Sequence, residues 1–489
     1  MLWHLSVSCR SSGSRRKNRS VCDNKIMRSG ILKIVLQLCL VAWAVMSVYQ
    51  CGKSDNSDTV AAVGDRLLTA DEFQWAYELA PRSVTQLGSD SARLVVLQRL
   101  INRSLLAQEG IKKGYDQDSS FRKILNYYRD KAITRELYMK HVRDSIRISD
   151  TDFEWAYEKY RTTLFVQNFR TATKEEAVLI RNVELEIPHT PINAFTKTRR
   201  LESYGPVDVV RWNVINEEIE DLLYRLPLLE YSEPVFDGKQ YHVFRIVEKE
   251  TEALPRESDF IAVKPTLESV LRKRKEHQKA FQFVRKTMVP QNLVIRAKTL
   301  NALTDRFWEF FRNSDESLPR GQEFREIQSL LTDDNLLKME LASFTDGSFK
   351  VSDYLFYYRL NPISINHASQ AAVRKGIQNA AATYIRDIVF ARIGKDEGLD
   401  RRSSVAQETL EWSDKLLAAK VKKELLKDIT SMTTDSSLYR DFYLDSLDRY
   451  ISGLRKNTDI TINKRLLSEI PVSDDGMNRK IDFFATYIQ

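Results

Sequence analysis

The chain has no cysteine beyond Cys51. All four cysteines, Cys9, Cys22, Cys39 and Cys51, lie in the first 51 of 489 residues. The remaining 438 residues (489 − 51) can therefore form neither an internal disulfide framework nor a thiolate metal site. The six histidines show no metal-ligand spacing, and the sequence has no HExxH motif, glycine-rich phosphate loop or nucleophile elbow. We therefore expect no metal and no cofactor.

Glycine and proline are also scarce, with 16 and 12 residues, whereas aromatic residues make up 10% of the chain. A chain of this composition can build packed cores and is not a disordered polymer. The net charge of +8 is concentrated at the amino terminus. Residues 1–50 hold eight Lys or Arg and one Asp, or +7, which leaves 67 basic and 66 acidic residues, or +1. A nearly neutral chain argues against nucleic-acid binding, which needs a basic face.

The apolar segment of residues 31–48 is interrupted by Lys33 and Gln37. Its unbroken part is shorter than the roughly 20 apolar residues that a membrane-spanning helix needs. The basic residues before and within the segment are typical of a secretory signal. Because the residues before Met27 are polar and basic and add nothing to such a signal, we expect Met27 to be the true start.

Cys51 follows this apolar segment and is itself followed by a polar stretch. The arrangement resembles a bacterial lipoprotein signal. The resemblance implies export, acylation of Cys51 and attachment to a membrane face. The alternatives are a plain signal anchor and a free Cys51. We expect residues 1–51 to be the leader and 52–60 a tether.

Residues 204–250 carry several local signals in a fixed order. A β-branched run at 207–212 predicts a strand, and apolar residues at helical spacing predict a one-sided helix over 216–226. Asp237-Gly238 is a turn signal, and residues 241–247 alternate as a strand does. Strand, helix, proline-bearing link and strand form one half of a small α+β domain.

Two motifs in this stretch carry a family resemblance. Ser232-Glu233-Pro234-Val235 and Tyr241-His242 resemble the C-terminal half of a parvulin-type peptidyl-prolyl isomerase domain. The first half is expected to start near Phe165 with a strand, followed by a helix that begins at the capping box from Thr173 to Glu176. The resemblance implies a small α/β domain over residues 161–250.

The resemblance also assigns the site positions. It places the catalytic position at His242 and the proline-binding positions at Ile215 and Ile219. The family's first-strand histidine falls at Asn168. Because one histidine cannot reproduce a network of two, we expect a vestigial isomerase site. In that case His242 is a strand histidine with one satisfied ring nitrogen.

Residues 61–160 are predicted to form a helical domain. A short strand with a Gly-Asp turn comes first, and a capping box from Thr69 to Glu72 starts a helix. Three further helices are predicted, over 91–113, 119–146 and 150–160.

The order of four blocks in this region resembles the amino-terminal domain of SurA-like and PrsA-like chaperones. The blocks are residues 63–65, 69–73, 100–109 and 111–118. In that family a helix after the isomerase domain often returns to the amino-terminal core, which implies this packing for residues 251–289. The apolar residues available for it are Leu267, Val270, Leu271, Phe281 and Val284.

The second half of the chain repeats the first weakly. Residues 349–362 echo the strand and helix that end at Pro81, with an offset of 281, and Gly398–Val405 echoes Gly114–Phe121, with an offset of 284. Residues 292–300 also echo 459–467. We interpret residues 290–489 as a second helical module without an isomerase insert, while chance similarity between amphipathic helices remains the alternative.

The sequence therefore predicts a mostly helical α+β protein, in which helical chaperone modules carry an inserted small parvulin-like α/β domain. We expect a lipid-anchored periplasmic holdase that binds unfolded outer-membrane or secreted polypeptides. Aromatic side chains at Trp75 and Tyr77 and at Tyr354, Phe356, Tyr357 and Tyr358 are candidates for that binding or for core packing. Two alternatives stay open: an active prolyl isomerase, and a structural lipoprotein subunit of an envelope assembly machine.

Overall fold

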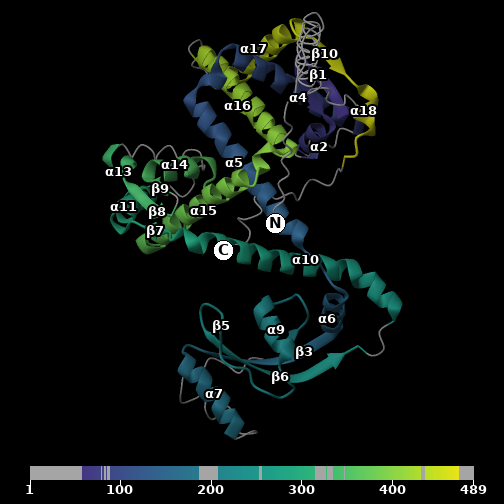
Figure 1. The fold of residues 1–489 in the computed structure, drawn as a ribbon, viewed down its shortest axis with the longest axis vertical. Helices are drawn as coiled ribbons and strands as arrows, with labels where there is room; N and C mark the ends of the chain where they lie inside the picture. The colour runs from purple at the N-terminus through teal and green to yellow at the C-terminus, as the bar shows by residue number, and fades with distance from the viewer. Residues whose placement is uncertain are drawn as a thin grey trace, which may run out of the picture. The chain divides into compact units, whose positions relative to one another are not determined.

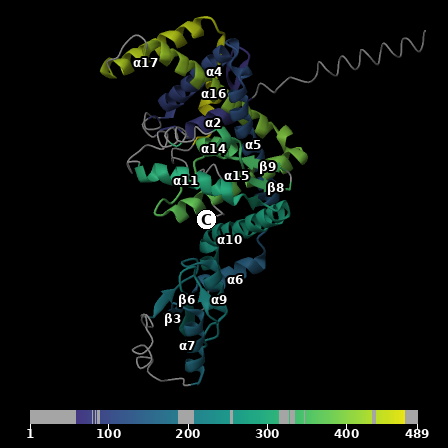
Figure 2. The same cartoon turned by 90° about the vertical axis from the view of Figure 1, so that its left-hand side faces the viewer.

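The computed structural model describes residues 58–78, 80–81, 84, 89–186, 207–252, 256–313, 327, 334–345, 347–430 and 436–472 (Figures 1 and 2). The predicted leader, with Cys51, and the tether up to residue 57 lie outside the described residues. The described chain is mostly helical with small antiparallel sheets, as the α+β prediction requires. None of the described helices combines the length and apolar character that crossing a membrane requires.

The chain divides into two compact units, and each draws on segments far apart in the sequence. The first unit combines residues 1–115 with 414–477, and the second combines 116–413 with 478–489. Both statements concern the described parts of these ranges.

The first unit holds a three-stranded sheet in the order β10-β1-β2, covered by helices. Its elements are β1 (Thr59–Val63), β2 (Arg66–Thr69), α2 (Ala70–Glu78), α4 (Ser89–Lys112), the end of α16 (Ser403–Thr430), α17 (Ser436–Lys456), β10 (Ile460–Ile462) and α18 (Lys464–Glu469). The core contains Phe73 and Leu97 from the start of the chain and Val421 and Leu467 from its end. This core therefore contains residues from well beyond the predicted range of 61–160.

The helical part of the second unit surrounds a sheet in the order β7-β8-β9. Its elements are α5 (Ser119–His141), α10 (Glu257–Met288), β7 (Val294–Ile295), α11 (Ala297–Asn313), α13 (Asp334–Lys338), β8 (Glu340–Phe344), β9 (Gly347–Lys350), α14 (Val351–Leu360), α15 (Gln370–Asp396) and the start of α16. Phe307, Tyr354, Tyr384 and Phe390 are fully buried at its centre. Leu137 of α5 belongs to the same core, so this core draws on residues before 161 as well as after 290.

The second unit also contains a four-stranded antiparallel sheet in the order β4-β3-β6-β5. Its elements are β3 (Thr162–Thr171), α7 (Lys174–Glu186), β4 (Asp208–Val210), α9 (Glu217–Arg225), β5 (Val235–Phe236) and β6 (Tyr241–Thr251). The apolar face of α9 packs on one side of this sheet with Leu164 and Phe244. Ala177 of α7 packs on the other side with Phe169 and Val243 (Figure 1). The predicted strand, helix, turn and strand are all present in this domain.

Local capping explains where these helices begin. The Asn216 side chain accepts hydrogen bonds from the backbone N–H groups of Glu218 and Ile219, which starts α9. Thr173 and Glu176 form the predicted capping box before α7, at 3.3 and 3.4 Å. Caps of this kind depend on residues only three apart, so they can be recognised from sequence.

Helix α10 has a different apolar partner at each end. Leu267 and Leu271 are buried against Ala156 of α6 (Asp150–Tyr160), and Figures 1 and 2 both show the two helices side by side. Further along, Ala280 joins the core around Phe390. Phe281, which we expected to be buried, is 57% exposed because it lies beyond the part of α10 that packs on α6.

Candidate functional site

His242 lies on β6 with a polar partner at each ring nitrogen. Its Nδ1 is 2.9 Å from Oδ1 of Asn168 on β3, and its Nε2 is 3.0 Å from Oδ2 of Asp237 in the turn before the strand. The ring also stacks on Phe244, with centroids 5.6 Å apart. The expectation of one satisfied nitrogen was therefore wrong: both nitrogens are engaged. Asn168 does face His242.

Asp237 is the polar residue of this cluster that the sequence reasoning missed. Its carboxylate accepts hydrogen bonds from the backbone N–H groups of Lys239 and Gln240, both at 2.8 Å, as well as facing His242. These backbone hydrogen bonds, and then the His242 contact, lower the pKa of Asp237 to about 2. The available signal was the Asp-Gly pair, because aspartate in such turns commonly binds the backbone that follows.

The Ser-Glu-Pro-Val motif lies next to the same strand. The Ser232 N–H donates to the Phe244 carbonyl at 2.8 Å, and its Oγ accepts from the Phe244 N–H at 2.9 Å. Just before it, Leu229 adopts a positive φ of 65° while its N–H donates to the Ile246 carbonyl. The link between α9 and β5 is therefore fixed along the strand that carries His242.

Ile215 and Ile219 lie on the α9 side of the sheet. Both are half-buried and pack against the core that contains Leu223 and Phe244. Because alternate residues of a strand point to the same face, His242 shares this face with Phe244. The predicted proline-binding residues thus lie on the same side of the sheet as His242, where they help to fill the core.

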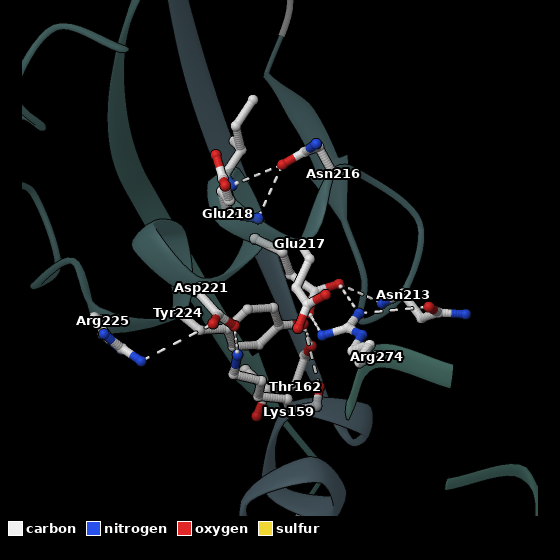
Figure 3. A network of polar contacts seen from close by, with 12 residues as sticks. Lys159, Thr162, Asn213, Asn216, Glu217, Glu218, Asp221, Tyr224, Arg225 and Arg274 are labelled. Atoms are coloured by element: carbon white, nitrogen blue, oxygen red, sulfur yellow. Dashed lines mark hydrogen bonds and ion pairs between the residues drawn. The ribbon is translucent and has the colours of Figure 1, made fainter. Parts of the chain in front are cut away.

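A buried ionic network joins α9 to α6 and α10 (Figure 3). Arg274 of α10 donates to both carboxylate oxygens of Glu220, at 2.8 and 3.1 Å, and Glu220 is fully buried. Lys159 of α6 binds Asp221 at 2.6 Å and lies 3.3 Å from the centre of the Trp155 ring. These contacts come from three elements, so they fix the orientation of the four-stranded domain on the two helices.

Burial sets the protonation behaviour of this network. Desolvation lowers the pKa of Lys159, although the contact with Asp221 opposes that change. Desolvation also raises the pKa of Tyr224 to about 12, and its hydroxyl donates to the Thr162 carbonyl at 2.8 Å. The Glu220–Arg274 pair serves structural positioning, because both of its side chains are buried from solvent.

Bulky apolar side chains of the four-stranded domain are exposed around this framework. Val214, Leu228, Leu229 and Phe236 are each more than half exposed. They come from the loops and strand that border α9 and β6, and Leu229 also has the positive φ noted above.

The aromatic candidates of the helical modules divide into two groups. Tyr77, Tyr354 and Tyr358 are buried in the two cores, as core packing predicts. Trp75, Phe356 and Tyr357 are partly exposed, and Lys123 lies 4.3 Å from the centre of the Phe356 ring. Only the side chains of the second group can contact another polypeptide while the cores stay folded.

Comparisons with known proteins were made for the whole chain. No protein-family model matches it, and no curated protein matches it. Solved structures that match include one from a study of two SurA-like chaperones of Campylobacter jejuni, at 18% identity and a TM-score of 0.21, over 47% of this chain and 96% of that one. The peptidylprolyl isomerase PrsA of Bacillus cereus matches at 14% identity and a TM-score of 0.21, over 46% and 88%.

The foldase protein PrsA of Streptococcus pneumoniae matches at 11% identity and a TM-score of 0.20, over 56% of this chain and 94% of that one. With TM-scores this low, the function of the chain has to be argued from its own residues. In the ranges that the structure describes, no group of three or more His, Cys, Asp and Glu side chains is placed to hold a metal ion.

Proposed function

We propose that the protein is a chaperone that binds unfolded polypeptides through exposed apolar side chains, with little prolyl isomerase activity. The observation that carries this proposal is a contrast within the four-stranded domain, between its incomplete isomerase site and its exposed apolar side chains. His242 is engaged by an amide and a carboxylate rather than by a second imidazole. In the same domain, Val214, Leu228, Leu229 and Phe236 expose apolar surface.

Isomerisation makes demands that this site meets poorly. Rotation about a peptide bond has a barrier of about 18–20 kcal/mol, lower before proline. An enzyme lowers it by enclosing the proline ring and adjusting polar contacts around the twisting amide. Here Ile215 and Ile219 pack into the domain core. Asn168 also lacks the two tautomers with which a histidine could take part in the network.

Holding an unfolded chain needs neither feature. Apolar side chains that accommodate many sequences are sufficient, and their binding grows with the apolar area removed from water. The partly exposed aromatic residues Trp75, Phe356 and Tyr357 offer further surface of this kind. Unfolded outer-membrane or secreted polypeptides are the clients that we propose.

We further propose that the protein is exported and anchored by acylated Cys51. The support is in the sequence: a basic-flanked apolar segment, then Cys51 and a polar tether. Such an anchor would hold the chaperone at a membrane face in the periplasm, where newly exported chains arrive unfolded.

An aggregation assay with a chemically unfolded β-barrel protein tests the binding function. The double variant Leu228→Ser/Phe236→Ser should suppress aggregation less than the native protein does, because it removes exposed apolar surface from the four-stranded domain. Leu94→Ser is a matched control, since Leu94 is 54% exposed, as is Leu228, but lies on α4. Equal suppression by the native protein and the double variant would contradict this assignment.

A prolyl-peptide isomerisation assay distinguishes this function from the main alternative, an active prolyl isomerase. The native protein should barely accelerate the reaction, and His242→Ala should leave aggregation suppression unchanged. A strong isomerase rate that collapses in His242→Ala would establish the enzyme instead. A protein that neither suppresses aggregation nor isomerises would be a structural subunit.

A further inference from the structure

The two halves of the chain contain the same elements in the same order. The hairpin β1–β2, helices α2 and α4, and helix α5 correspond to β8–β9, α14 and α15, and α16. A glycine with positive φ precedes the last helix in both halves, Gly114 at 74° and Gly398 at 73°, and 398 − 114 = 284. Helices α5 and α16 then begin at Ser119 and Ser403, with the same offset. The repeat detected in the sequence is therefore a repeat of structure.

The helix that follows the positive-φ glycine of each repeat, α5 or α16, packs in the core of the other repeat. Ile133 and Leu137 of α5 are buried with Tyr384 and Phe390, which belong to the second repeat. The same offset leads from these two α5 positions to Leu417 and Val421 of α16. Val421 is buried with Leu97 of the first repeat. Each core therefore contains a helix that the other half of the sequence supplies.

A glycine lies at the same position of each repeat where the exchanged helix makes its contact. A Cβ atom at Gly110 of α4 would lie 3.1 Å from Cβ of Leu417. A Cβ atom at Gly394 of α15 would overlap Cγ2 of Ile133. These are the same contact in each repeat, since 394 − 110 and 417 − 133 both equal 284. In both places the missing side chain allows the exchanged helix to approach closely.

The last strand of each repeat is exchanged in the same way. Ala61 of β1 pairs with Ile462 of β10, and Ala342 of β8 pairs with Ile295 of β7. The flanking hydrogen bonds also correspond. Gly64 N–H donates to the Asp459 carbonyl at 2.9 Å, and Thr345 N–H donates to the Gln291 carbonyl at 2.7 Å. The offset from Gly64 to Thr345 (345 − 64 = 281) is the one found for this block in the sequence.

We infer that the chain is a tandem duplication whose two repeats have reciprocally exchanged the helix after the positive-φ glycine and the final strand. Each core is the binding partner of a segment from the other repeat, so neither repeat contains a complete core. The repeats differ in one respect: the first carries residues 142–256 between α5 and α10, whereas only residues 431–435 separate α16 from α17. The exchange does not depend on the chaperone function proposed above.

An unexchanged arrangement makes opposite predictions about the same residues. In it, each repeat would keep its own last helix, and Gly110 would face Ile133 while Gly394 would face Leu417. The two arrangements can therefore be distinguished by asking which pairs are energetically coupled, because residues in contact give non-additive effects and distant ones do not.

Double-mutant cycles in the full chain provide the test. Gly394→Ala should lower the unfolding midpoint, and Ile133→Ala should rescue part of that loss, whereas Leu417→Ala should add to it. Gly110→Ala should instead be coupled to Leu417→Ala, which removes the Cδ2 atom that lies 3.3 Å from the added methyl group, and not to Ile133→Ala. Rescue in the opposite pairs would overturn the inference, and so would additive effects in all four.

Engineered disulfides remain informative if the alanine variants fold poorly. The Ala61→Cys/Ile462→Cys variant, with Cys9, Cys22, Cys39 and Cys51 changed to Ser, contains only the two engineered thiols. It should form one intramolecular disulfide that changes mobility on a non-reducing gel. Ala61→Cys/Ile295→Cys is the matched control and should stay reduced. Cross-linking in the control would overturn the exchange. Cross-linked dimers of the first variant would also overturn it, because they would place the exchange between two chains.

Discussion

At the scale of residues, Asp237 and Glu220 show two ways in which a carboxylate can organise the four-stranded domain. Asp237 lies at a turn and is held by backbone N–H groups, so its ionised form is favoured in the folded state. Glu220 is enclosed and depends on the guanidinium of Arg274. The first can be replaced with a modest effect, whereas the second cannot lose its partner without leaving a buried charge.

The turn predicts a specific pH dependence for Asp237→Asn. The folded pKa of about 2 lies below the ordinary value of 3.8, so the ionised carboxylate stabilises the fold. This contribution is complete above about pH 4 and is lost as the pH falls through about 2. The denaturation midpoint of the variant should therefore lie below that of the native protein at neutral pH. Denaturant titrations at several pH values should show that the difference between the two denaturation midpoints becomes smaller below pH 4. A difference that does not change with pH would mean that the charge of Asp237 does not cause it.

The buried ion pair predicts a larger effect for Arg274→Met. Removal of one partner from a buried pair typically costs about 3–5 kcal/mol, because the other charge stays buried without compensation. Urea unfolding should show this loss. The double variant Glu220→Gln/Arg274→Met should recover much of it, since no buried charge remains. A loss under about 1 kcal/mol in the single variant would mean that water reaches Glu220.

At the scale of elements, helix α10 shows that apolar residues of one long helix can have different environments. Leu267 is fully buried against α6, whereas Phe281 is exposed, although both are apolar positions of the same helix. Leu267→Ala should lower the free energy of unfolding by about 2–5 kcal/mol, the usual cost of a cavity. Phe281→Ala should change it by no more than about 0.5 kcal/mol. Thermal and denaturant unfolding of the two variants would check this contrast, and equal losses would contradict the observed packing.

The sequence predicted most elements because their signals are local. The capping box at Thr173 and the apolar stripe of α9 involve residues within two turns of each other. Glu72 shows what local sequence signals cannot predict. The predicted cap from Thr69 to the Glu72 N–H is present, but the Glu72 carboxylate binds Arg66 and Arg103 in a buried cluster. Long-range partners such as these follow from the fold and leave no pattern in the local sequence.

The candidate site was predictable to a similar degree. His242 and its neighbour Asn168 were located through motifs, whereas Asp237 was not, because a turn aspartate has no fixed partner in the sequence. The repeat in the second half was visible because two of its blocks recur at nearly the same offset. Which core each helix enters was not visible, since two copies of a repeat carry equivalent apolar faces and either arrangement satisfies the pattern.

At the scale of the whole molecule, the predicted anchor gives a simple test. Cys51→Ser removes the proposed acceptor, so the protein should become soluble or remain as an uncleaved precursor. Palmitate labelling and the mass of the mature amino terminus would establish which form is present. If the Ser variant fractionates with membranes as a cleaved species, the lipid anchor is wrong.

The exchange of segments between repeats also determines the order in which the cores can close during synthesis. The first core needs Val60 from the beginning of the described chain and Ile470 from near its end. At about 5–20 residues per second, the ribosome needs roughly 20–80 s to make the interval between them. The second core needs nothing beyond Val405 and can form earlier. The core that contains the first hairpin is therefore completed last, and until then it lacks the strand and helices that the end of the chain supplies.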